Sequence, residues 1–131
     1  MPTRRIPVLL VVLLVAIAVV NWLAESYYWY WRMRWFDMPM HFAGGVWLAG
    51  VAMWWRYYHH EKLPVSFLQI LTTCLVAALG VGLLWEVFEA ELSFVTAGHI
   101  NAVPDTLKDL LFDTIGGIVV AGFVWFRDKL K

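Results

Sequence analysis

Charged residues are scarce in this sequence, and the two signs balance. They make up 15% of the 131 residues, with ten Lys and Arg against ten Asp and Glu. A net charge of zero provides no global field that would attract nucleic acid. The single cysteine, Cys74, excludes an internal disulfide, and its apolar neighbours predict a buried small side chain. The sequence also lacks a phosphate-binding glycine loop, a Ser–His–Asp triad and a thiolate cluster.

Apolar residues dominate instead. They account for 62% of the chain, against about 45–50% in soluble domains. About 20 apolar residues span a hydrocarbon core of about 30 Å, and four segments reach or approach that length: Ile6–Ala24, Met38–Trp55, Phe67–Phe88 and Leu107–Phe126. The first segment begins like a signal peptide but continues to full spanning length, so a retained helix is expected. The prediction is an all-α integral membrane four-helix bundle, a single transmembrane domain over 1–131 with helices at about 6–24, 38–57, 66–89 and 105–126.

The loops predict an orientation, because Lys and Arg mark the cytoplasmic side. With both termini inside, the cytoplasmic side would hold Arg4, Arg5, Arg56, Lys62, Arg127, Lys129 and Lys131. The outer side would hold only Arg32, Arg34 and Lys108. We therefore expect a multi-pass protein of the inner (cytoplasmic) membrane with an N-in/C-in topology. Tryptophan and tyrosine crowd both predicted boundaries, as is typical of membrane interfaces.

Acidic side chains gather where the second and third predicted helices reach the outer side. Asp37 and His41 are four residues apart, and Glu86 and Glu89 are three apart. Either spacing places both side chains on one face of a helix. Two helices therefore present acidic faces at the same side of the membrane.

The fourth predicted helix begins DTLKDLLFDTIGG and carries Asp105, Asp109 and Asp113 on one stripe. The helix dipole favours acidic groups only within the first turn, and Asp113 lies two turns in. Ionisable groups at such a depth cost at least a few kcal/mol and mark functional sites. Asp105 follows Pro104 and is expected to cap the helix.

Depth and packing predict that these faces meet. His41 lies fifteen residues before Arg56, and Asp113 lies fourteen before Arg127, so both are about 21–23 Å from the inner boundary. Small residues four apart continue the same faces and allow helix backbones to approach closely. These pairs are Gly45 and Ala49, Ala78 and Gly82, and Gly117 and Ala121.

A cation is one way to compensate such a cluster, because like charges cannot all stay ionised together. The candidate metal ligands are Asp37, His41, Glu86, Asp109 and Asp113. The candidate catalytic carboxylates are Glu86, Glu89 and Asp109. Oxygen ligands with one imidazole suit Mg²⁺, Mn²⁺, Fe²⁺ or Zn²⁺. Protons, or Arg32 and Arg34, are the alternative compensation, and His99 is a candidate extra ligand. A buried network that only stabilises the bundle is the non-functional interpretation.

These motifs resemble the VanZ-like and YjdF-like small bacterial membrane proteins. The matching elements are Asp37-x-x-x-His41-Phe42 with Gly44-Gly45, Trp85-Glu86-x-x-Glu89, and Asp105-Thr106-x-x-Asp109 with Asp113 and Gly116-Gly117. They cover roughly two-thirds of the chain. VanZ-type sequences tend to carry Glu-x-x-Gln in the third element and an asparagine deeper in the fourth. Glu89 and Asp113 stand there instead, so the YjdF-like variant is the closer fit. The resemblance implies a multi-helix membrane fold, and one branch is linked to glycopeptide-antibiotic resistance.

Three functions follow as hypotheses. The first is a divalent-cation pocket open to the outer leaflet that binds or processes an envelope lipid or lipid-linked headgroup. Such an enzyme would be a metal-dependent lipid or lipid-phosphate hydrolase or transferase. The second is a proton- or cation-coupled transporter acting as a homodimer, and the third is a structural membrane scaffold. All three have the lipid bilayer as their partner, and none involves nucleic acid.

The stripe on the fourth helix generates a first prediction. Asp105→Ala should cost only the stability of a helix cap, about 0.5–2 kcal/mol, whereas Asp109→Ala should abolish ligand binding at the site. Thermal unfolding and cation binding of the two purified variants check this. Equal loss of binding in both would contradict the assignment of Asp105 as a cap.

Overall fold

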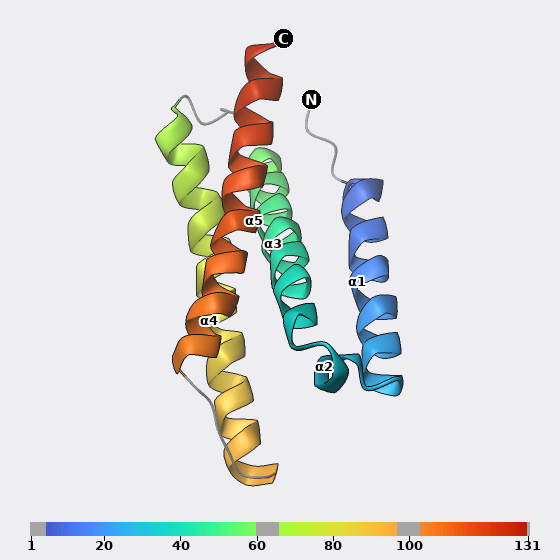
Figure 1. Ribbon diagram of the computed structural model, residues 1–131. Coiled ribbons are helices and arrows are strands. Elements are labelled where there is room, and N and C mark those ends of the chain that lie inside the picture. Colours follow the sequence, from blue (N-terminus) through green and yellow to red (C-terminus); the bar gives the residue numbers. More distant parts are fainter. Residues whose placement is uncertain (1–4, 60–65, 97–102, 131) are drawn as a thin grey trace.

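The structure is a computed structural model that describes residues 5–59, 66–96 and 103–130, and it is all-α (Figure 1). Its elements are α1 Val8–Ser26, α2 Trp29–Arg32, the 3-10 helix η1 Arg34–Phe36, α3 Asp37–His59, α4 Phe67–Thr96 and α5 Val103–Lys129. The expected all-α class is confirmed. Two features differ from the sequence expectation: α4 continues past Glu89 to Thr96, and the first connection contains the short helices α2 and η1.

Local signals explain where the helices begin and end. The amide of Gln69 donates to Ser66 Oγ over 3.2 Å, so Ser66 caps the start of α4. Tyr28 has a φ of 57°, a left-handed conformation that interrupts the helical path between α1 and α2. Asp37 lies in the first turn of α3, where a carboxylate complements the helix dipole. The proline in that turn, Pro39, is tolerated because the first amides of a helix have no intrahelical acceptor.

Within the part of the chain that the structure describes, three helices are long and apolar enough to cross a membrane: Val8–Ser26 in α1, Phe67–Phe88 in α4 and Leu107–Lys129 in α5. The helix α3 is not among them, although its 23 residues extend about 34 Å. Its position explains its lower hydropathy. It lies between α1 and the pair α4 and α5, and packs against all three (Figure 1). From Asp37 to Arg56, the only exposed residues are Pro39 and Trp55, so α3 is shielded by the other helices.

The bundle core lies among α3, α4 and α5, toward the end where α3 terminates. Its buried members are Ala49, Met53, Ile70, Cys74, Ala121 and Val124. Cys74 is a free, buried thiol, which confirms the expectation for this residue. The small residues predicted to mediate close packing are buried as well, including Ala49, Ala78 and Ala121 at 0% exposure.

Glycines bring α3 and α5 into backbone contact. A Cβ on Gly45 would lie 2.5 Å from the carbonyl oxygen of Asp113, and a Cβ on Gly116 would lie 2.6 Å from the carbonyl oxygen of Phe42. A side chain at either position would have to push the helices apart. The first turns of α3 and the middle of α5 therefore lie too close together for a side chain at either glycine.

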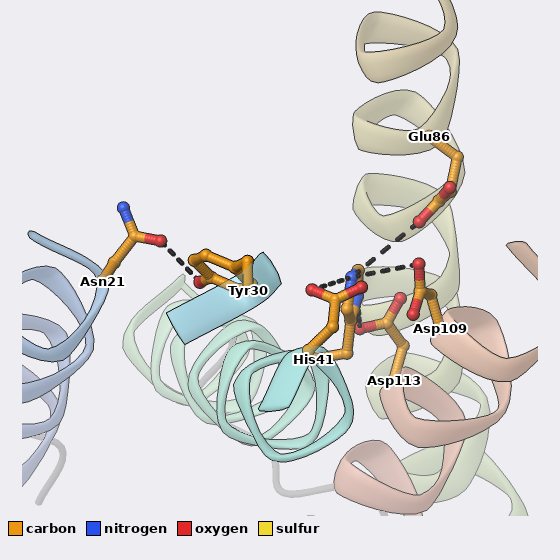
Figure 2. A network of polar contacts seen from close by, with 7 residues as sticks. Asn21, Tyr30, His41, Glu86, Asp109 and Asp113 are labelled. Atoms are coloured by element: carbon orange, nitrogen blue, oxygen red, sulfur yellow. Dashed lines mark hydrogen bonds and ion pairs between the residues drawn. The ribbon is translucent and has the colours of Figure 1, made fainter. Parts of the chain in front are cut away.

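The helix α1 packs at the periphery, on α3. Trp47 of α3 donates its indole N–H to the carbonyl of Leu10 over 2.9 Å. At the other end of α1, the Tyr30 hydroxyl donates to Asn21 Oδ1 over 2.7 Å (Figure 2). Of the described α1 residues only Ala24 is buried. The remaining surface of α1 is largely exposed and apolar, which suits contact with lipid.

The backbone contact predicts different outcomes for adjacent glycines. Gly45→Ala should destabilise the protein by about 1–3 kcal/mol, because overpacking forces backbone shifts. Gly44→Ala is the matched control: nothing lies within 4 Å of a Cβ at Gly44, and alanine favours the helix by up to about 1 kcal/mol. Thermal unfolding in detergent checks the pair, and equal midpoints for both variants would contradict the close packing of α3 and α5.

Candidate functional site

A single imidazole lies at the centre of the acidic cluster. His41, on the second turn of α3, points into the space between α3, α4 and α5 (Figure 2). Its Nε2 atom lies 3.5 Å from Asp37 Oδ1 and 3.4 Å from Asp109 Oδ2. Glu86 of α4 approaches the same nitrogen over 3.9 Å through Oε1. Three helices thus contribute carboxylates to one side of the ring.

The other ring nitrogen has a different partner. His41 Nδ1 lies 3.2 Å from Asp113 Oδ1, within hydrogen-bonding distance. Asp113 is one turn further along α5 than Asp109, so the two aspartates contact opposite nitrogens of the same imidazole. All five residues expected to share a site are therefore brought together, but around His41 rather than as five equivalent groups.

Exposure is graded through the cluster. The Asp37 side chain is 44% exposed, whereas those of His41, Glu86 and Asp109 are only 10–11% exposed. The Asp113 side chain is the most deeply buried, at 5%. The site is therefore accessible at Asp37, at the end of the bundle where α3 begins, and closes toward Asp113.

The cluster carries an excess of negative charge when its groups are ionised. Asp37, Glu86, Asp109 and Asp113 each form an ion pair with His41. Four carboxylates against one imidazolium leave three negative charges. Burying this excess negative charge is costly, because the carboxylates lose their hydration. Protons or a divalent cation would reduce it.

Three of the residues form a group that could hold a metal ion. One donor atom each from Asp37, His41 and Asp109 can be chosen so that all lie within 4.8 Å of one another. Two ligands about 2.1 Å from one ion are about 3.4 Å apart at a tetrahedral angle, close to the distances from His41 Nε2 to the two aspartates. A group of one imidazole and two carboxylates, with Glu86 nearby, could hold a divalent ion.

Several candidate residues are not brought to the site by the described part of the structure. The Arg32 side chain is exposed, and no ion pair joins it to the cluster among the described residues. The side chains of Arg34, Glu89 and Asp105, and the whole of His99, lie outside what the structure describes. Two roles therefore stay predictions: that of Glu89 as a catalytic carboxylate and that of His99 as an extra ligand.

Gly82 also contributes to the site, although the sequence predicted only a packing role for it. Gly82 of α4 faces the Asp113 carboxylate, and a Cβ there would overlap Asp113 Oδ2. Its sequence signal was a small residue one turn before Glu86, on the same helix face. That spacing does not reveal which side chain of another helix fills the space.

The chain belongs to the family described as predicted membrane protein (DUF2238), which matches residues 2–129. This membership, with the three candidate spans, establishes a membrane protein. No curated protein and no solved structure matches the chain. The family description carries no activity, and the resemblance to VanZ-like and YjdF-like proteins stays an interpretation of the motifs.

The contacts of His41 predict an energetic coupling with Asp113. In a double-mutant cycle of His41→Phe and Asp113→Asn, the unfolding free energies should be non-additive by about 0.5–3 kcal/mol, because the residues contact each other. Chemical or thermal unfolding in detergent measures the four proteins. A cycle of His41→Phe with Asp128→Asn is the control, since Asp128 lies near the far end of α5 and should give additive effects. Additivity in both cycles would refute the contact.

Proposed function

We propose that this member of the DUF2238 family binds a divalent cation between Asp37, His41 and Asp109, and uses it to bind or process an envelope lipid or lipid-linked headgroup. The observation that carries the proposal is the group of ligand atoms from these three residues, all within 4.8 Å of one another. The ion would be Mg²⁺, Mn²⁺, Fe²⁺ or Zn²⁺, since oxygen ligands and one imidazole suit each of them.

The proposed topology puts this pocket at the outer leaflet. The chain forms one transmembrane domain in which α3 crosses the bilayer together with α1, α4 and α5. The start of α1 and the end of α5 lie at the same end of the bundle (Figure 1), and the basic residues assign that end to the cytoplasm. The site lies at the opposite end. Asp37, the most exposed site residue, then faces the outer headgroup region of the inner membrane.

The proposed chemistry uses the cation as a Lewis acid. An ion held there would polarise a phosphoryl or ester oxygen and activate water. Glu86, on α4 and close to His41 Nε2, would act as general acid or base, with Glu89 as the second candidate. Asp109 would hold the ion. The reaction class would be metal-dependent hydrolysis or transfer of a lipid or lipid phosphate.

A transporter is the second candidate, but the described residues favour a one-ended pocket. Next to the site, α3 and α5 meet in backbone contact at Gly45 and Gly116. From these glycines toward the end where α3 terminates, the bundle is filled by the apolar core of Ala49, Met53 and Cys74, with residues of α5. A carrier needs polar groups along its whole path. Transport would therefore require a second copy of the chain to form the remainder of the path.

Cation binding is the first test. Purified protein loaded with Mn²⁺ or Zn²⁺ should retain about one ion per chain, measured by elemental analysis after removal of free metal. Asp109→Asn and His41→Ala should each lose it. Asp128→Asn makes the same change as Asp109→Asn on the same helix, away from the site, and should retain the ion. Equal and negligible metal in all four proteins would end the proposal.

The same proteins separate an enzyme from a scaffold. Incubated with vesicles of bacterial membrane lipids and the bound metal, the unaltered protein should change the lipid profile measured by mass spectrometry, and Asp109→Asn should not. A well-folded Asp109→Asn protein that loses turnover excludes a purely structural role. Unchanged lipids with intact metal binding would instead direct the search to transport by a dimer.

A further inference from the structure

Asp113 is the most deeply buried carboxylate of the cluster. The residue is 3% exposed and lies in a membrane-spanning stretch of α5. Its Oδ1 atom faces His41 Nδ1 over 3.2 Å. Its Oδ2 atom is buried and has no hydrogen-bond partner among the described residues. A buried carboxylate oxygen without a partner costs about 1–3 kcal/mol or more of stability. Stability alone therefore does not account for an aspartate at this position.

Glycines make the space that this carboxylate occupies. A Cβ on Gly82 would overlap Asp113 Oδ2, and one on Gly45 would collide with the Asp113 main chain. Neighbours from α3 and α4 therefore enclose both the side chain and the backbone of Asp113. The space at Gly82 accommodates the carboxylate in the orientation in which Oδ1 meets the imidazole.

The contact determines which way the imidazole ring presents its second nitrogen. A neutral imidazole that donates Nδ1–H to a carboxylate keeps a lone pair on Nε2. In this structure Nε2 is the nitrogen that faces Asp37 and Asp109. Carboxylates that accept the second N–H of a metal-binding histidine orient the ring and raise its affinity for the ion.

We propose that Asp113 is a positioning residue: in the space left by Gly82, it accepts the Nδ1–H of His41 and directs Nε2 at the cation. The effect on the cation rests on the proposed function, whereas the orientation of the ring does not. Asp109 and Asp113, four residues apart on one helix, then have different roles, one as ligand and one as support for a ligand. Asp113 is not a ligand itself in this arrangement, because it meets the ring at the nitrogen opposite the ligand group.

Two variants test the proposal by different routes. Asp113→Ala removes the acceptor, so that no side chain at this position can bind the Nδ1–H of His41. Gly82→Ala removes no polar group and only displaces the carboxylate. Gly80→Ala is the matched control on the same helix, since nothing lies within 4 Å of a Cβ there. His41→Phe assigns the ring signals of His41.

The first readout needs no metal. In protein labelled with ¹⁵N-histidine, the unaltered chain and Gly80→Ala should show a slowly exchanging Nδ1–H resonance of His41. Asp113→Ala and Gly82→Ala should lose it. The second readout is the affinity for Zn²⁺, measured by calorimetry, which should fall about 10–100-fold in these two variants and stay within twofold in Gly80→Ala.

The outcomes separate the two proposals. Persistence of the Nδ1–H resonance in Asp113→Ala would overturn the positioning role, whatever the metal affinity. Clear Zn²⁺ binding with equal affinity in the unaltered chain, Asp113→Ala, Gly82→Ala and Gly80→Ala would also overturn it while leaving the proposed function intact. No Zn²⁺ binding by the unaltered chain, with a resonance that depends on Asp113 and Gly82, would support the orientation of His41 and refute the cation site.

Discussion

The backbone contact between α3 and α5 is the constraint on which the site depends. Gly45 meets the main chain of Asp113, and Gly116 meets the main chain of Phe42. Helices normally pack about 8–10 Å apart because side chains separate them. Glycine removes that spacer, and the short aspartate side chains of α5 then reach the imidazole of α3. With larger residues here, His41 and Asp113 would not be in contact, and the carboxylates would have no shared centre.

Membrane packing explains why such a contact is stable. Between lipid-exposed helices there is little hydrophobic drive for association, so close van der Waals contact and buried polar contacts provide it. In this bundle the two coincide: small residues pack α5 against α3 and α4, and the polar contacts of His41 lie directly beside them. The apolar core of Ala49, Met53 and Cys74 continues the same interface toward the other end. Packing and site are consequently inseparable in this fold.

Position around the ring divides the acidic residues into roles that their chemistry alone does not distinguish. Asp37 is exposed enough to meet solvent or a ligand, Asp109 and Glu86 lie beside the same imidazole nitrogen, and Asp113 holds the opposite one. Different residues are therefore available to bind an ion, to meet a substrate and to form a supporting hydrogen bond. The membrane contributes by lowering the dielectric around the buried members, which strengthens every electrostatic interaction between them.

The sequence by itself determined the all-α class, the membrane setting and the set of residues that meet. Apolar length specifies helices in a bilayer because backbone groups must be hydrogen-bonded internally. Spacings of three and four placed Asp37 with His41, and Asp109 with Asp113, on single faces. Only the tertiary structure decided which nitrogen of His41 each carboxylate contacts, because that depends on helix rotation and separation. It also decided that Gly82 faces Asp113, and that α3 is the shielded helix. These features arise from contacts between residues distant in the chain, and periodicity within one helix carries no information about them.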